Sequence, residues 1–153
     1  MLKYDGYSIV LQEVPDEISL AINITGCPYA CDGCHSPHLQ EDRGRPVKED
    51  IFKLIEEYKD QVSCICFMGG DYAPEELAKL IVEIRMFCNL KIALYCGDDN
   101  PSNVLWLLAD YIKIGHYDKE CGGLSDPNTN QRMYKLYSTW YDITDMFQPR
   151  KDL

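Results

Sequence analysis

The stretch SCICFMGGDYAPEELAKLIVEIRMFCNLKIALYC, residues 63–96, decides the fold class of this chain. It begins with a short apolar run that ends at Gly69 and Gly70. Apolar residues spaced three to four apart follow Pro74, and a second apolar run stops at Gly97. The two runs are typical of buried strands, and the segment between them is typical of an amphipathic helix that begins at a proline. A strand, a helix and a second strand in this order predict a βαβ unit with parallel strands.

The same alternation of strands and helices extends to both sides of this unit. Residues 17–25 (EISLAINIT) alternate apolar and polar side chains and predict a strand, and residues 7–14 are expected to pair with it through a turn at Pro15 and Asp16. Further expected elements are a helix that opens at Pro46, a short helix at 103–109 and a strand at 110–115. A full eight-unit barrel typically needs about 250 residues. We therefore predict an α/β fold: a partial (β/α) barrel with a mostly parallel curled sheet.

Composition limits the functions that this chain can have. The 153 residues, 46% of them hydrophobic and 26% charged, predict one domain over residues 1–153 with an ordinary core. Asp and Glu number 25 against 15 Lys and Arg, and the net charge of −10 argues against nucleic acid as a partner. The longest apolar run, residues 104–109, is far short of the roughly 20 residues that span a bilayer. With no secretory signal at the N-terminus, the expectation is a cytoplasmic protein that does not enter a membrane.

Three of the eight cysteines lie together directly after the first predicted parallel strand. The stretch GCPYACDGCH contains Cys27, Cys31 and Cys34 with the spacing C-x3-C-x2-C. Thiolates are soft ligands that favour iron–sulfur clusters, zinc or Cu(I). Three cysteines on a [4Fe–4S] cluster leave one iron without a protein ligand, whereas zinc needs a fourth ligand such as His35 or His38. Because no second cysteine pair with zinc-finger spacing is present, the pattern favours the cluster over zinc.

The remaining predicted parallel strands also end in distinctive residues. Gly69, Gly70 and Asp71 follow one strand, Cys96 and Gly97 the next, and Gly115 and His116 the last. Ligands of such sheets bind at the carboxyl ends of the strands, so we expect these residues to surround a site together with the cysteine loop. The alternative for the glycine–glycine–aspartate turn is an ordinary connection between a strand and a helix. Cys64 and Cys66 share one face of a strand and are expected to pack in the core.

The cysteine loop and the later glycine–glycine–acid turn together resemble the radical S-adenosylmethionine (SAM) superfamily. Within it, the stretch GCPYACDGCHSP and the later TNQR, residues 129–132, are similar to the activating proteins of anaerobic ribonucleoside-triphosphate reductase. The resemblance extends from about residue 18 to residue 132.

The resemblance implies both cofactors and the residues that bind them. Cys27, Cys31 and Cys34 would hold a [4Fe–4S] cluster, and no other residue would be catalytic. SAM would chelate the fourth iron and be cleaved reductively to methionine and a 5′-deoxyadenosyl radical. The implied SAM-binding residues are Gly33, Cys34, His35, Gly69, Gly70 and Asp71. Relatives often have Glu at the position of Asp71, which leaves the direct contact of this shorter side chain open.

The resemblance also implies macromolecular partners. The radical would take a hydrogen atom from a backbone glycine of the glycyl radical subunit of anaerobic ribonucleoside-triphosphate reductase. The electron would come from a donor such as flavodoxin or ferredoxin. Two other interpretations remain open: activation of a different glycyl radical enzyme, and a non-catalytic zinc-binding interaction domain.

Overall fold

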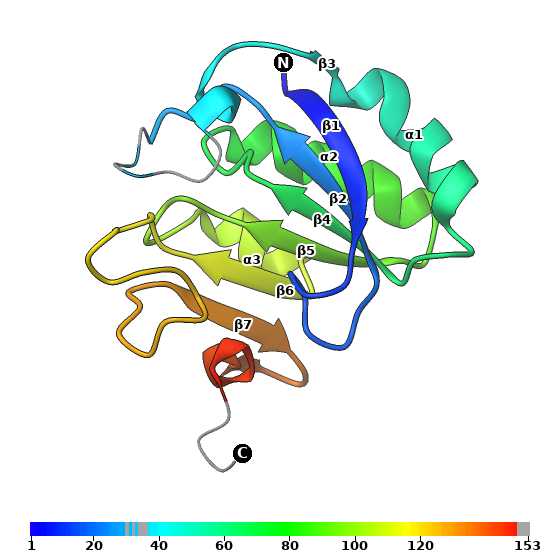
Figure 1. The fold of residues 1–153 in the computed structure, drawn as a ribbon. Coiled ribbons are helices and arrows are strands. Elements are labelled where there is room, and N and C mark those ends of the chain that lie inside the picture. Colours follow the sequence, from blue (N-terminus) through cyan, green and yellow to red (C-terminus); the bar gives the residue numbers. More distant parts are fainter. Residues whose placement is uncertain (30, 32, 34–36, 150–153) are drawn as a thin grey trace.

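The computed structural model describes residues 1–29, 31, 33 and 37–149. In this part of the chain, eight strands form one sheet in the order β3-β1-β2-β4-β5-β6-β7-β8 (Figure 1). The strands are β1 (Lys3–Val10), β2 (Ser19–Ile24), β3 (Arg45–Pro46), β4 (Cys64–Met68), β5 (Lys91–Tyr95), β6 (Tyr111–Ile114), β7 (Arg132–Leu136) and β8 (Trp140–Asp142). The helices are α1 (Val47–Tyr58), α2 (Pro74–Phe87) and α3 (Asn103–Leu108), with short 3-10 helices η1 (Pro37–Gln40) and η2 (Thr144–Phe147).

The four central strands β2, β4, β5 and β6 are parallel neighbours. They are the four strands that the sequence predicts around the βαβ unit, and α1, α2 and α3 connect each one to the next. Their register aligns Ile22 of β2 with Phe67 of β4 and Leu94 of β5. Because parallel neighbours all point the same way, the loops after these four strands emerge at one edge of the sheet.

The expected partial (β/α) barrel with a mostly parallel curled sheet is wrong. The sheet is open, and of the seven strand pairings in the described residues four are antiparallel: β1 with β2, β1 with β3, β6 with β7, and β7 with β8. A parallel neighbour needs a crossover to return to the starting end of the sheet, usually through a helix. The described connection between β6 and β7, residues 115–131, contains no helix, so β7 runs back beside β6. The polar, weakly periodic sequence after residue 116 gave no sign of this terminal hairpin.

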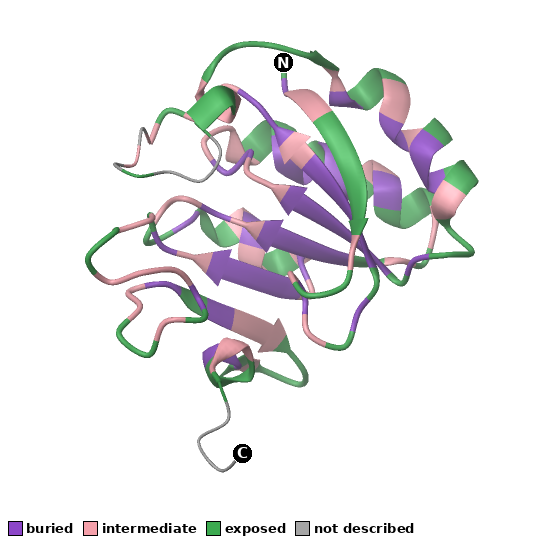
Figure 2. Ribbon diagram, in the orientation of Figure 1, coloured by how far each residue is buried: buried purple, intermediate pink, exposed green. Residues whose placement is uncertain are grey.

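The helices cover one face of the sheet, and loops cover the other (Figures 1 and 2). On the helix side, Ile22, Ile65 and Ile92 belong to a large core with the apolar residues of α1, α2 and α3. On the opposite side, Cys64 and Cys66 lie in a smaller cluster that is closed by side chains from loops and the C-terminal segment: Val14, Leu124 and Ile143. Alternate residues of each strand point to opposite faces, which explains the two sets. The prediction that Cys64 and Cys66 pack in the core is confirmed, because both are fully buried.

The first two helices follow their sequence patterns closely. Val47, Ile51, Leu54 and Ile55 of α1 are buried, and so are four large apolar residues of α2: Leu77, Leu80, Ile81 and Ile84. Apolar residues at this spacing form one stripe along a helix, and burial of that stripe against the sheet accounts for most of the stability of each helix. Within the described residues, no helix has the length and apolar character needed to cross a membrane.

Candidate functional site

The carboxyl ends of β4, β5 and β6 are joined by backbone hydrogen bonds. The amide of Gly69 donates to the carbonyl of Tyr95 at 3.0 Å, and the amide of Cys96 donates to the carbonyl of Lys113 at 2.8 Å. The amide of Gly115 donates to the carbonyl of Asp98 at 2.9 Å. The glycine-containing ends of β4, β5 and β6 therefore form one continuous edge beside the cysteine loop.

The cysteine loop leaves β2 and is closed at its base by two backbone hydrogen bonds. The amide of Gly26 donates to the carbonyl of Glu41 at 2.9 Å, and the amide of Cys27 donates to that of Leu39 at 3.1 Å. Cys27 and Cys31 are half-buried within this closed loop.

Two predicted site residues, Cys34 and His35, lie outside the described residues. His38, the other histidine considered as a zinc ligand, belongs to η1 and is exposed. Gly33 has a φ of 76°, and a Cβ there would lie 3.4 Å from the ring of Tyr117 and 3.5 Å from Cβ of Lys119. The loop therefore approaches the segment that follows β6.

Asp71 links the cysteine loop to the ends of β4 and β5. The Tyr29 hydroxyl donates a hydrogen bond to Oδ2 of Asp71 at 2.9 Å, and the amide of Asp98 donates to the same oxygen at 3.0 Å. Asp71 is only 6% exposed. Burial, and then the charge and hydrogen bond of Asp71, raise the pKa of Tyr29 well above its usual range, so the phenol stays protonated and remains a donor.

The two glycines before Asp71 have a conformational role. Gly69 and Gly70 have φ values of 109° and 97°, in the left-handed region that residues with a side chain rarely adopt. The carbonyl of Gly70 then accepts a hydrogen bond from the amide of Ala73 at 3.1 Å, at the start of α2. This turn directs Asp71 toward the cysteine loop.

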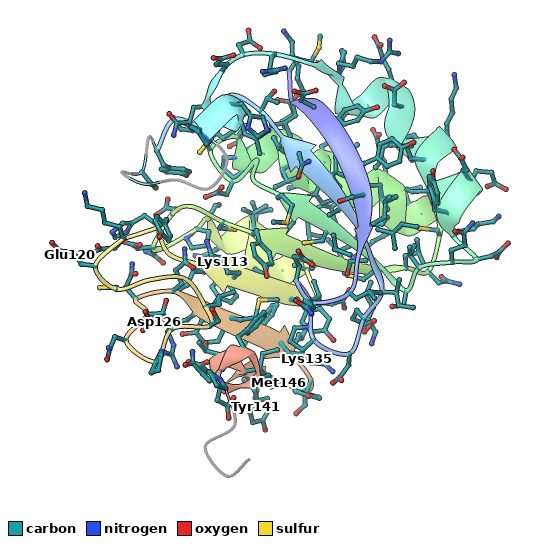
Figure 3. The ribbon with its side chains drawn as sticks, in the orientation of Figure 1. Lys113, Glu120, Asp126, Lys135, Tyr141 and Met146 are labelled. Carbon is teal, nitrogen blue, oxygen red and sulfur yellow. The ribbon has the colours of Figure 1, made fainter. Side chains whose placement is uncertain are left out.

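Lys113 places a buried ammonium group at the same edge (Figure 3). Its Nζ donates to the carbonyls of Cys96 at 3.0 Å and Gly115 at 2.9 Å. Burial lowers the pKa of Lys113, and electrostatic interactions with Cys96, Asp71, Cys31 and Cys27 oppose that effect. A cation in this position favours an anionic group between the strand ends and the loop.

A pocket of about 420 Å³ opens between the cysteine loop and the segment after β6. Its lining consists of Tyr29, Cys31, His116, Tyr117, Asp118, Lys119 and Glu120. The Nδ1 atom of His116 lies 2.8 Å from Oδ1 of Asp99, and this contact fixes the orientation of the imidazole ring. Hydrogen bonds from the side chain and amide of His116 hold the pKa of Asp99 below its usual range. The pocket therefore combines aromatic, thiol and charged groups next to the loop.

The structure separates the residues of the TNQR stretch. The side-chain amide of Asn130 donates to the backbone carbonyl of His116 at 3.1 Å. The side-chain amide of Gln131 donates to the backbone carbonyl of Gly115 at 3.3 Å. Arg132 instead forms an ion pair with Asp142 on β8, with 2.8 Å between the two groups. The side chains of Asn130 and Gln131 thus support the site edge, and that of Arg132 does not.

Tyr29, Asp98 and Asp99 are parts of this site that were not predicted from the sequence. Tyr29 had a usable signal, since it is the aromatic residue between the first two cysteines. Asp98 acts through its backbone amide, and Asp99 acts through a residue 17 positions away in the chain. Neither contact leaves a pattern in the sequence.

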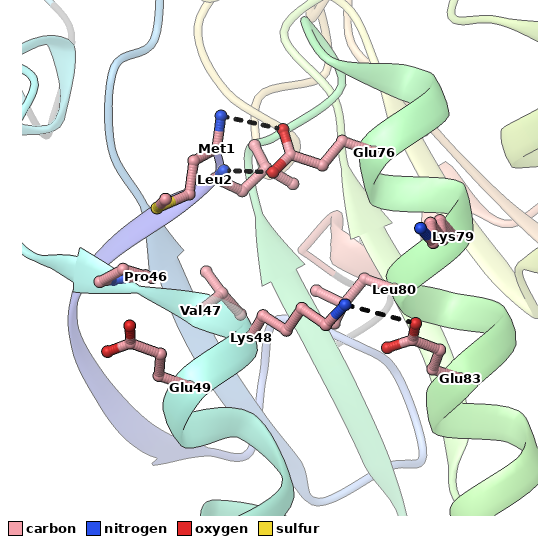
Figure 4. A pocket seen from close by; sticks show the side chains of 10 residues that line it. All are labelled: Met1, Leu2, Pro46, Val47, Lys48, Glu49, Glu76, Lys79, Leu80 and Glu83. Carbon is pink, nitrogen blue, oxygen red and sulfur yellow. Dashed lines mark hydrogen bonds and ion pairs between the residues drawn. The ribbon is translucent and has the colours of Figure 1, made fainter.

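A second pocket, of about 490 Å³, lies between the start of the chain, α1 and α2 (Figure 4). Ion pairs cross it: the amino group of Met1 lies 3.3 Å from Glu76, and Lys48 lies 3.6 Å from Glu83. The described residues that line it include neither cysteine nor histidine. The described lining of this pocket therefore lacks the thiol and imidazole ligands that a metal site like the cysteine loop would need.

Comparison with known proteins identifies the family. A family model described as "4Fe-4S single cluster domain" matches residues 18–102, which is more than half of the chain. The chain belongs to this family. The 4Fe-4S single cluster domain includes β2, the cysteine loop, the glycine turn after β4 and the end of β5. No curated protein and no solved structure matches the chain.

The ligand type of the described loop cysteines fits an iron–sulfur cofactor. Within them, no group of three or more His, Cys, Asp or Glu side chains is arranged to hold a metal ion. Two of the three loop cysteines, Cys27 and Cys31, are described, and cysteine sulfur is the ligand that such clusters take. The Lys113 ammonium is close enough to Cys27 and Cys31 to interact with them electrostatically. The family match shows that the chain is an iron–sulfur protein, and oxidoreductase chemistry is compatible with such a protein.

Proposed function

We propose that this chain is an iron–sulfur activase that cleaves SAM and generates a glycyl radical on anaerobic ribonucleoside-triphosphate reductase. Cys27, Cys31 and Cys34 would hold the [4Fe–4S] cluster. One observation carries the proposal: a three-cysteine loop, in a chain of the single-cluster family, lies against a glycine–glycine–aspartate turn at one sheet edge. Three thiolates leave one iron available to a ligand that is not protein, as the resemblance to radical SAM enzymes implies.

The residues around the loop have the chemistry that SAM requires. Asp71 would accept hydrogen bonds from the methionyl ammonium, and such charge-assisted bonds are strong in a buried site. Gly69 and Gly70 give the turn before Asp71 its left-handed backbone, and Gly33, Cys34 and His35 would lie near the adenosine part. When bound and reduced, the cluster supplies the electron that splits the sulfonium into methionine and a 5′-deoxyadenosyl radical.

The open side of the pocket suits a macromolecular substrate. The pocket beside Cys31 is walled by the segment 116–120, and a glycine loop of the reductase would complete the enclosure and exclude water. A flavodoxin or ferredoxin would deliver the electron to the cluster.

The first test is metal analysis of protein purified without oxygen. We expect about four irons and four sulfides per chain, a brown colour that reductant bleaches, and release of 5′-deoxyadenosine and methionine from SAM. Changing Cys27, Cys31 or Cys34 to Ala should remove most of the iron and all SAM cleavage. Cys88→Ala, outside the loop at the end of α2, should keep both. Colourless protein with one zinc would support the interaction-domain alternative instead.

The second test concerns the partner. The loaded protein, SAM, a reductant and candidate glycyl radical enzymes are mixed without oxygen, and the glycyl radical is sought by electron paramagnetic resonance. A radical on anaerobic ribonucleoside-triphosphate reductase alone supports the proposal. A radical on a different enzyme class alone transfers the activase role to that partner.

A further inference from the structure

We propose that Tyr29 is a positioning residue that fixes the cysteine loop against the ends of β4 and β5, so that the loop is preorganised for its cluster. This inference rests on the cluster site of the proposed function but not on SAM cleavage. The observation that carries it is a side chain held at both its hydroxyl and its ring, midway between Cys27 and Cys31.

The hydroxyl end of Tyr29 is held by a buried carboxylate. Its hydrogen bond to Oδ2 of Asp71 measures 2.9 Å, and the Asp98 amide at 3.0 Å fixes the same oxygen. Hydrogen bonds to an ionised, buried acceptor are stronger than neutral ones. One oxygen atom thus ties the cysteine loop to the turn after β4 and to the connection after β5.

The ring of Tyr29 is held by the backbone of Gly97. A Cβ atom built on Gly97 would lie 2.5 Å from Cδ2 and 2.9 Å from Cε2 of the ring, closer than real Cβ contacts. Only glycine therefore allows the ring to pack where it does. Gly97, which follows β5, and Asp71, which follows β4, thus contact the Tyr29 side chain at its ring and at its hydroxyl.

The position of Tyr29 explains why the anchor matters for a metal site. The loop base is already closed through Gly26 and Cys27, but those bonds lie at the ends of the segment 27–39. Tyr29 adds a fixed point inside the loop, two residues from each of the first two cysteines. Ordering a loop in advance removes an entropy cost that cluster binding would otherwise carry.

The chain offers a matched control for the test. Tyr4 on β1 donates the same kind of hydrogen bond to Oδ2 of Asp50 on α1, at 2.8 Å, away from the cysteine loop. Tyr29→Phe and Tyr4→Phe each remove one phenol–carboxylate bond from the fold. Any effect of Tyr29→Phe that Tyr4→Phe lacks therefore belongs to the loop.

The experiment compares iron release from full-length wild type and both variants, loaded with iron and sulfide without oxygen. We expect Tyr29→Phe to lose iron to a chelator about tenfold faster than wild type, and Tyr4→Phe to match wild type. Gly97→Ala, which displaces the ring but leaves the hydroxyl, should act like Tyr29→Phe. The visible circular dichroism of the cluster should change in Tyr29→Phe and Gly97→Ala but not in Tyr4→Phe. A general loss of stability would not produce this spectral change.

Two outcomes would overturn the inference in distinguishable ways. Loaded wild type and Tyr29→Phe with equal iron release and equal cluster spectra would reject the role of Tyr29 and leave the proposed function intact. Wild type that takes up no iron would reject the cluster site itself, and both proposals with it. Loaded wild type that fails to cleave SAM, with fast iron release from Tyr29→Phe, would reject the activase and support the anchor.

Discussion

The two ends of the parallel strands each bury a charged side chain, but they treat it differently. At the amino end, Glu17 is 7% exposed, and its Oε2 lies 3.2 Å from Nζ of Lys91 and 3.3 Å from the Tyr111 hydroxyl. At the carboxyl end, Lys113 is 8% exposed, and its ammonium donates to two carbonyl oxygens, which carry no net charge. The first charge is paired with the side chain of Lys91, whereas the second is bonded to carbonyl oxygens and has Asp71 and the cysteines of the loop within electrostatic reach.

This difference distinguishes a buried charge that only stabilises the fold from one that can act on a cofactor. The buried carboxylate of Glu17, just before β2, is bonded to Lys91 of β5 and Tyr111 of β6, so it stabilises the fold and offers nothing to a ligand. A buried cation among carbonyls raises the electrostatic potential of the space beside it and favours an anion there. We therefore expect changes at the amino end to alter stability alone, and changes at the carboxyl end to alter the cofactor.

The largest expected effect is at Glu17. Glu17→Gln keeps the shape of the side chain but removes the charge that Lys91 and Tyr111 bind, and the free energy of unfolding should fall by about 2 kcal/mol. Denaturant titration of the wild type, Glu17→Gln and the exposed-site control Glu57→Gln measures this loss. Iron content after loading should be unchanged in all three. Loss of iron from Glu17→Gln would remove the distinction between the two ends.

The next effect is at Lys113. Lys113→Met removes a positive charge near the cysteine loop, so reduction of a bound cluster, which adds negative charge, becomes less favourable. At a fixed potential the ratio of reduced to oxidised cluster should fall about tenfold, a shift of roughly 59 mV toward negative values for one electron. A redox titration followed by electron paramagnetic resonance measures it, with Lys135→Met on the neighbouring strand β7 as the control. Equal potentials in wild type and Lys113→Met would show that this cation has no influence on the cofactor.

The smallest effect is the pH dependence of stability at the amino end of β4. Burial raises the pKa of Cys64 from its ordinary 9.0 to about 12. Stability from the neutral buried thiol is fully present below pH 9 and is lost as the pH rises toward 12, because the unfolded thiol ionises first. At pH 10 the loss should be about 1 kcal/mol.

Cys64→Ala isolates this contribution from that of other buried groups. The fall in unfolding free energy between pH 8 and pH 10 should be smaller in Cys64→Ala than in wild type, whatever the variant costs at pH 8. Chemical denaturation at both pH values gives the comparison. An identical fall in the two proteins would assign the alkaline loss to other groups.

The sequence by itself determined the local elements and the cofactor loop. Periodicity is a property of neighbouring residues, so the four parallel strands, α1 and α2 followed from the spacing of apolar side chains and from Pro46 and Pro74. The C-x3-C-x2-C spacing likewise indicated a cluster loop, and the single-cluster family agrees with it.

Only the tertiary structure decided how the sheet ends and what surrounds the loop. The antiparallel strands β1, β7 and β8 replaced the expected barrel because pairing direction depends on how a connection crosses the sheet, which no local pattern records. The contacts of Tyr29 with Asp71, and of Lys113 with Cys96, join residues 42 and 17 positions apart. They exist because parallel register brings successive strand ends to one edge, and register is fixed by packing of the whole sheet rather than by either residue.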